Sequence, residues 1–62
     1  MFRMIEVVGA SPTSFAEATK AAVQRLLADG QKVHFFTLSE LRGAVRDGKI
    51  EFQVIVKVAV EA

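Results

Sequence analysis

The chain opens with Ile5-Glu6-Val7-Val8-Gly9-Ala10-Ser11-Pro12-Thr13-Ser14-Phe15 and closes with Glu51-Phe52-Gln53-Val54-Ile55-Val56-Lys57-Val58. The opening stretch predicts a strand from Phe2 to Val8, rich in Val and Ile, that leads into a capped helix. The closing stretch predicts a strand with one polar amide, Gln53, on the face away from its apolar core. Together the two stretches indicate a helix that covers one side of a sheet.

Two positions could start the helix. Ser11 is a good N-cap, and Pro12 after it suits the first helical position, where its missing N–H would be unpaired anyway. Ser14 and Glu17 have the spacing of a capping box one turn later. The sequence leaves both starts open.

The helix is expected to run to about Ala28. Asp29-Gly30 ends it, since Gly30 can adopt the left-handed conformation that follows a helix C-terminus. A helical wheel places the residues of its apolar face together: Phe15, Thr19, Ala22, Val23 and Leu26.

Two further strands are predicted, from Val33 to Val45 and from Ile50 to Glu61. Arg46-Asp47-Gly48-Lys49 between them is a strong hairpin signal. A two-residue Asp-Gly turn would pair odd residues of one strand with even residues of the other. We favour a type I turn with Gly48 as a left-handed bulge, which pairs Val45 with Lys49 and keeps like parity together.

The bulged register gives the hairpin one apolar face and one mixed face, and a slip of one residue would exchange them. The apolar face, for the helix to cover, carries Phe36, Leu38, Phe52, Val54, Val56, Val58 and Val60. The mixed face suits an interface or a ligand, and carries Phe35, Thr37, Ser39, Leu41, Gln53, Ile55, Lys57 and Ala59. The predicted fold is α+β, a single β-α-β-β domain over residues 1–62, with a three-stranded antiparallel sheet wrapped on one helix.

Composition points to self-association. A domain of 62 residues buries only about 60% of its unfolded surface, and chains this short usually need disulfides, a metal or oligomerisation. The chain has no Cys and one His, yet 52% of its residues are hydrophobic. Because that is more apolar material than one small core can hide, we expect a homo-oligomer.

Charge and hydropathy exclude several kinds of partner. The formal net charge of +1 gives little attraction for nucleic acid, and the basic residues are scattered. No apolar run approaches the length of a membrane span, and the N-terminus lacks the regions of a secretory signal. We therefore expect a cytoplasmic protein with no nucleic-acid or membrane partner.

No residues suggest catalysis or a metal site. Ser11, Thr13 and Ser14 would need a base, and the one His, His34, lies on another strand. Helix capping explains the two serines better. The acidic residues show no paired spacing, so we expect a protein that is not an enzyme and a chain without a metal cluster of its own.

Phe35 and Gln53 are the candidate ligand-binding residues. An aromatic ring offers a stacking plane, and a Gln amide offers one acceptor and two donors. The isoalloxazine ring of a flavin suits both, since it has flat faces and a polar pyrimidine edge. Each residue also fits an ordinary strand position, as packing or exposed side chain, and that interpretation stays open.

Taken in order, several segments resemble the dodecins, small flavin-binding proteins that assemble into hollow dodecamers. These segments are Ile5 to Ser11, the helix, Glu40-Leu41-Arg42-Gly43, Asp47-Gly48 and Glu51-Phe52-Gln53-Val54 to Val58. The resemblance covers nearly the whole chain. It implies a β-α-β-β subunit with the sheet partly wrapped around the helix, and flavins bound in pairs near twofold axes, between aromatic rings and a Gln of the third strand.

By position Gln53 is similar to that Gln, and Phe35 falls where flavin-binding members usually carry Trp. In the bulged register the two residues lie about six residues apart along the strands, roughly 20 Å, so a site shared between subunits is expected. The resemblance implies a non-catalytic storage or buffering protein for riboflavin or FMN, assembled as a homododecamer. The alternative is a dodecin-like assembly without flavin, which binds a metal ion, coenzyme A or a protein partner.

Overall fold

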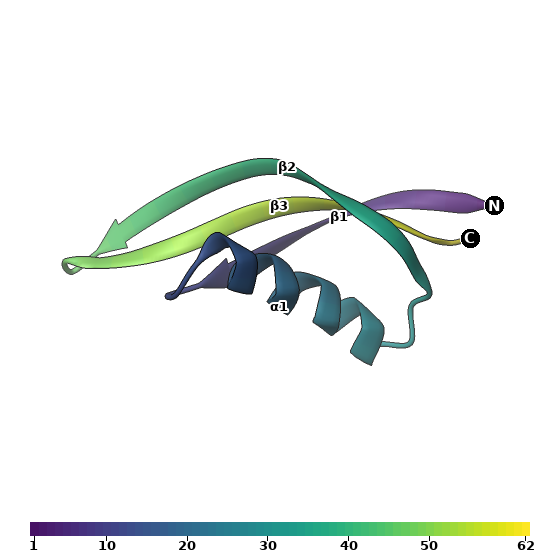
Figure 1. Ribbon diagram of the computed structural model, residues 1–62, viewed down its shortest axis with the longest axis horizontal. Coiled ribbons are helices and arrows are strands. Elements are labelled where there is room, and N and C mark those ends of the chain that lie inside the picture. Colours follow the sequence, from purple (N-terminus) through teal and green to yellow (C-terminus); the bar gives the residue numbers. More distant parts are fainter.

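The computed structural model describes residues 1–62 and has a three-stranded sheet that arches over one helix (Figure 1). Strand β1 spans Phe2–Ser11, helix α1 Phe15–Ala28, strand β2 Val33–Arg46 and strand β3 Lys49–Glu61. β3 lies in the centre of the sheet, and β1 and β2 pair with it antiparallel on either side. The predicted fold class and order of elements are confirmed.

The helix begins at the later of the two predicted positions. Ser14 is the N-cap, and its Oγ accepts a hydrogen bond of 3.0 Å from the backbone N–H of Glu17. Ser11 is the last residue of β1 instead, and its Oγ accepts a hydrogen bond of 3.0 Å from the N–H of Thr13. Both serines therefore satisfy backbone donors on the path from strand to helix.

The helix ends where the sequence predicted. Asp29 is the C-cap and Gly30 follows in the left-handed region, with φ of +86°. The N–H of Gly30 donates to Leu27 O and the N–H of Gln31 donates to Leu26 O, both at 3.1 Å. This pair of hydrogen bonds is a Schellman motif, which satisfies carbonyls that the helix would otherwise leave unpaired.

Gly9 brings the helix and the sheet into close contact. β1 does not end at Val8 as predicted, but continues to Ser11, with Gly9 opposite Val54 of β3. A Cβ atom at Gly9 would lie 2.1 Å from the carbonyl oxygen of Ala18 in α1. The helix can therefore approach this closely only because residue 9 has no side chain.

The core consists of small helix residues against valines of the central strand. Its fully buried members are Ala18, Ala22, Val54, Val56, Val58 and Val60, and Ile5, Val7, Phe15, Val23, Leu26 and Val33 pack around them. The predicted apolar helix face is confirmed, although Ala18, which is fully buried, was missed. The short side chains let α1 sit deep in the concave side of the sheet.

The predicted bulged turn is wrong. Arg46 pairs with Lys49 and Val45 with Ile50, so the hairpin has a two-residue turn. Both turn residues have positive φ, +50° at Asp47 and +75° at Gly48, as in a type I′ turn. This turn wins because its backbone twist matches the right-handed twist of the two strands.

A bulge inside β2 shifts the pairing with β3 by one residue. This shift cancels the difference between the predicted turn and the observed one. Leu38 pairs with Val56 and Glu40 with Ile55, so Ser39 is an extra residue in the ladder. From Leu38 back to Phe35 the pairings are therefore those of the predicted register. Between the bulge and the turn they differ by one residue.

Leu41 is the residue that this correction moves. The sequence placed it on the mixed face, but it lies opposite Val54 and thus on the helix side of the sheet. Ser39, also assigned to the mixed face, is the bulged residue itself. A second irregularity lies between Val33 and Phe35, around His34.

Strand β2 remains largely uncovered, because α1 lies mainly against β1 and β3. Every residue of β2 is exposed except Val33 and Ala44, which are half-buried. The exposed side chains include Phe35, Phe36, Leu38, Leu41 and Val45. A groove of about 410 Å³ separates β2 from α1. The helix is neither long nor apolar enough to cross a membrane.

Candidate functional site

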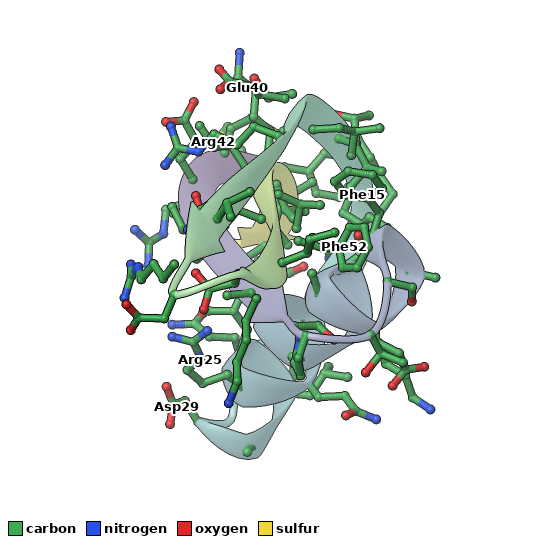
Figure 2. All side chains as sticks on the ribbon, turned by 90° about the vertical axis from the view of Figure 1, so that its left-hand side faces the viewer. Phe15, Arg25, Asp29, Glu40, Arg42 and Phe52 are labelled. Carbon is green, nitrogen blue, oxygen red and sulfur yellow. The ribbon has the colours of Figure 1, made fainter.

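The side of the sheet away from α1 carries the candidate site. We call it the outer face, and its strand β3 residues are Glu51, Gln53, Ile55, Lys57 and Ala59, which alternate with the buried valines. Figure 2 shows Glu40 and Arg42 projecting on this side, whereas Phe15 and Phe52 lie together between sheet and helix. The Phe15 and Phe52 rings meet edge to face, with centroids 5.0 Å apart.

Phe35 lies on the outer face, as predicted. It pairs with Ala59 of β3, and 47% of its surface is exposed in the single subunit. The ring of Phe2, from β1, stands at 90° to the Phe35 ring with centroids 5.7 Å apart. Phe2 thus packs against Phe35 and leaves much of the Phe35 ring accessible as a stacking surface.

His34 completes an aromatic cluster with Phe2 and Phe35 at this end of the sheet. The Phe2 and His34 rings are 4.6 Å apart between centroids, at 53°. His34 Nε2 also contacts Oε2 of Glu61, the last residue of β3. Ser11 lies at the opposite end of the sheet, opposite Phe52. The fold therefore separates His34 from Ser11 by most of the length of β3.

Gln53 lies on the outer face of the central strand, flanked by Ala10 of β1 and Arg42 of β2. Its Oε1 accepts a hydrogen bond of 2.8 Å from Arg42 Nε. Its Nε2 donates a hydrogen bond of 2.8 Å to Glu51 Oε1, two residues earlier on the same strand. Arg42 Nη1 lies 3.7 Å from Glu40 Oε2. The half-buried amide is thus held by a basic residue and an acidic residue.

The structure does not bring Phe35 and Gln53 together within one subunit. Phe35 pairs with Ala59, which lies six residues from Gln53 along β3. At the rise of a strand this separation is roughly 20 Å. Both side chains nevertheless occupy the same face, and the Ser39 bulge is the reason. Without the bulge, the parity set by the turn would direct Phe35 toward the helix.

Sequence reasoning missed Arg42, Glu51 and Phe2. The bulged-turn register placed Leu41 opposite Gln53, so the charged neighbour one residue further along the strand was not recognised. A type I′ turn at Asp47-Gly48 would have predicted the pairing of Arg42 with Gln53 directly. No group of three or more His, Cys, Asp or Glu side chains is placed to hold a metal ion.

Comparison with known proteins gives one family and a set of similar structures. The dodecin family model matches residues 1–62. Calcium dodecin from Mycobacterium tuberculosis, described with a novel calcium-binding site, superposes with a TM-score of 0.91 at 28% identity, over 100% of this chain and 90% of that chain. The dodecin from Streptomyces coelicolor superposes at 0.90 and 32% identity, again over 100% and 90%.

A third similar structure is a Thermus thermophilus dodecin in which a tryptophan is replaced by phenylalanine. It superposes with a TM-score of 0.87 at 28% identity, over 97% of this chain and 91% of that chain. No curated protein sequence matches the chain significantly.

Proposed function

Because the chain belongs to the dodecin family, we propose that it is a flavin-binding storage or buffering protein, assembled as a hollow homododecamer in the cytoplasm. The ligand is riboflavin or FMN, and no reaction is catalysed. Phe35 supplies a stacking plane for the isoalloxazine ring, and Gln53 hydrogen-bonds its pyrimidine edge. Storage by stacking also sequesters the flavin from photochemistry.

The observation that carries the proposal is the position of the two residues. Phe35 and Gln53 share the uncovered face of a dodecin subunit, but six residues of β3 separate them. That distance is too great for one subunit to contact the same part of one flavin with both. Where two subunits meet, the Phe35 of one and the Gln53 of the other can belong to one site.

The polar residues of the chain favour binding over catalysis. The hydroxyl groups of Ser11 and Ser14 accept hydrogen bonds from backbone N–H groups, and His34 contacts Glu61 at the far end of the sheet. Nucleophile and base are therefore not within hydrogen-bond reach of each other, as acyl-transfer chemistry requires.

Gln53→Ala tests the proposal. Loss of a neutral hydrogen bond costs about 0.5–1.5 kcal/mol, so affinity for riboflavin should fall about 2- to 12-fold while the assembly stays intact. The measurement is a fluorescence titration of ligand-free protein, with the oligomer checked by light scattering. Gln24→Ala, on the exposed side of α1, is the matched control. Equal affinities of the parent and Gln53→Ala would show that Gln53 does not bind the edge of the flavin ring.

A second function is favoured by the calcium dodecin among the similar structures. In that case the assembly would bind a metal ion, with ligands gathered from several subunits around a symmetry axis. Calorimetric titration with CaCl₂ measures calcium binding, and a parallel fluorescence titration measures riboflavin binding, so the two together separate the functions. Calcium binding by protein that does not quench riboflavin would favour this second function.

A further inference from the structure

The two ends of the Gln53 amide face neighbours of opposite hydrogen-bonding character. Arg42 has only donors, so the atom that faces it must be the amide oxygen. The ionised Glu51 carboxylate has only acceptors, so the atom that faces it must be the amide nitrogen. A half-turn of the amide would place donor against donor and acceptor against acceptor. The chemistry of the neighbours therefore fixes the order of the two atoms.

We propose that Arg42 and Glu51 are positioning residues that hold the Gln53 amide in one orientation. The outer face then recognises a ligand edge on which an N–H and a C=O stand side by side in a set order. This inference rests on the proposed flavin function, and it adds which residues determine the hydrogen bonds between Gln53 and the flavin ring. Neither Arg42 nor Glu51 needs to touch the ligand.

Counting hydrogen-bonding groups shows what the fixed amide can still offer. An amide oxygen can accept two hydrogen bonds and an amide nitrogen can donate two. Arg42 occupies one acceptor position and Glu51 takes one N–H. One acceptor and one donor remain, next to each other, and they match an adjacent N–H and C=O on a lactam or imide edge.

The pyrimidine edge of a flavin presents C2=O, N3–H and C4=O in that order. A Gln amide can pair with N3–H and with only one of the two carbonyls. If the order of the amide atoms is fixed, the choice of carbonyl also fixes which face of the ring points in a given direction. With a freely rotating amide, either carbonyl could be paired in either orientation of the ring.

Arginine suits this task better than lysine would. Its planar guanidinium directs Nε at Gln53 while Nη1 lies 3.7 Å from Glu40, so the side chain is held from two directions. Arg46, on the same strand, lies beside the turn opposite Lys49 and has no such partner among the hydrogen bonds and ion pairs of the structure. It serves as the matched control of equal charge.

The first test needs no ligand. The chain has no asparagine and three glutamines, Gln24, Gln31 and Gln53, so amide NH₂ signals from side chains are few. In deuterated protein labelled with ¹⁵N-glutamine, one Gln53 Nε2 proton should exchange more slowly with solvent than its geminal partner. Arg42→Ala should reduce that difference, and Arg46→Ala should preserve it. Rapid, equal exchange of both Gln53 protons in the parent protein would overturn the inference.

The second test compares riboflavin with N3-methylriboflavin, which lacks the N3–H donor. The parent protein and Arg46→Ala should prefer riboflavin by about 2- to 12-fold, the value of one neutral hydrogen bond. In Arg42→Ala the preference should shrink, because the freed amide can turn its N–H toward a carbonyl. Arg42→Lys keeps the charge and should behave like Arg42→Ala.

The outcomes separate this inference from the function on which it rests. If the parent binds riboflavin but Arg42→Ala discriminates as well as the parent does, the positioning role is wrong and flavin storage stands. If the parent binds neither flavin, the proposed function fails, while amide exchange still decides whether Arg42 and Glu51 hold Gln53.

Discussion

Phe35 presents a smaller ring than the indole that the dodecin resemblance implies for the stacking position. It is exposed on the outer face and supported from one side by Phe2. Phe35→Trp should tighten riboflavin binding by at most about tenfold and deepen the quenching of flavin fluorescence, because indole offers more contact area and donates electrons more readily. A fluorescence titration measures both effects.

Phe35→Ala is the control for this substitution. It should remove the stacking plane and restore the emission of bound flavin. If neither substitution changes affinity or quenching in an intact assembly, Phe35 is only a packing residue.

Gly9 is a single residue on which the stability of the subunit depends. Gly9→Ala would place a methyl group 2.1 Å from Ala18 O, a backbone atom that cannot move without the helix. Overpacking of this kind costs about 1–3 kcal/mol, so the midpoint of urea unfolding should fall clearly. Gly43→Ala is the control, since a Cβ atom there would meet nothing closer than Glu51 O at 3.8 Å. A similar midpoint for both variants would contradict the close helix–sheet contact.

Individual elements differed in how far the sequence could define them. The helix end follows from Gly30, whose positive φ few other residues adopt, and it was predicted correctly. The start offered two capping serines, and Ser14 is the N-cap because Ser11 is still paired with Phe52 in the sheet. No local sequence pattern marks the Ser39 bulge, because the bulge offsets the one-residue shift in pairing that the turn sets eight residues away. The pairing of Arg42 with Gln53 was therefore not predicted either.

Deletion of Ser39 tests the role of the bulge. Since Ser39 is the extra residue, its removal should leave Leu38 opposite Val56 and Phe35 opposite Ala59, now in a regular ladder. Cross-strand Hα–Hα contacts in NMR spectra should show these pairs unchanged, and quenching of riboflavin should persist. If Phe35 instead lost its contact with Ala59 and turned toward α1, Ser39 would not be the extra residue, and the bulge would not determine on which face Phe35 lies.

At the scale of the whole molecule, a single subunit leaves much apolar surface in water. Only 10 of its 62 residues are buried, and nearly all of β2 is exposed. Such a surface is typical of a subunit whose core is completed by its neighbours. We predict a homododecamer, which native mass spectrometry would identify directly. A stable monomer at micromolar concentration would contradict the shell and the shared ligand site together.

In the assembly that we propose, flavin binds between side chains of different subunits. The most direct test of this binding is a titration of riboflavin with ligand-free, assembled protein, followed by flavin fluorescence. Saturable quenching is expected, because the isoalloxazine ring stacks on Phe35. Riboflavin emission that stays unchanged at a large excess of intact assembly would contradict this binding.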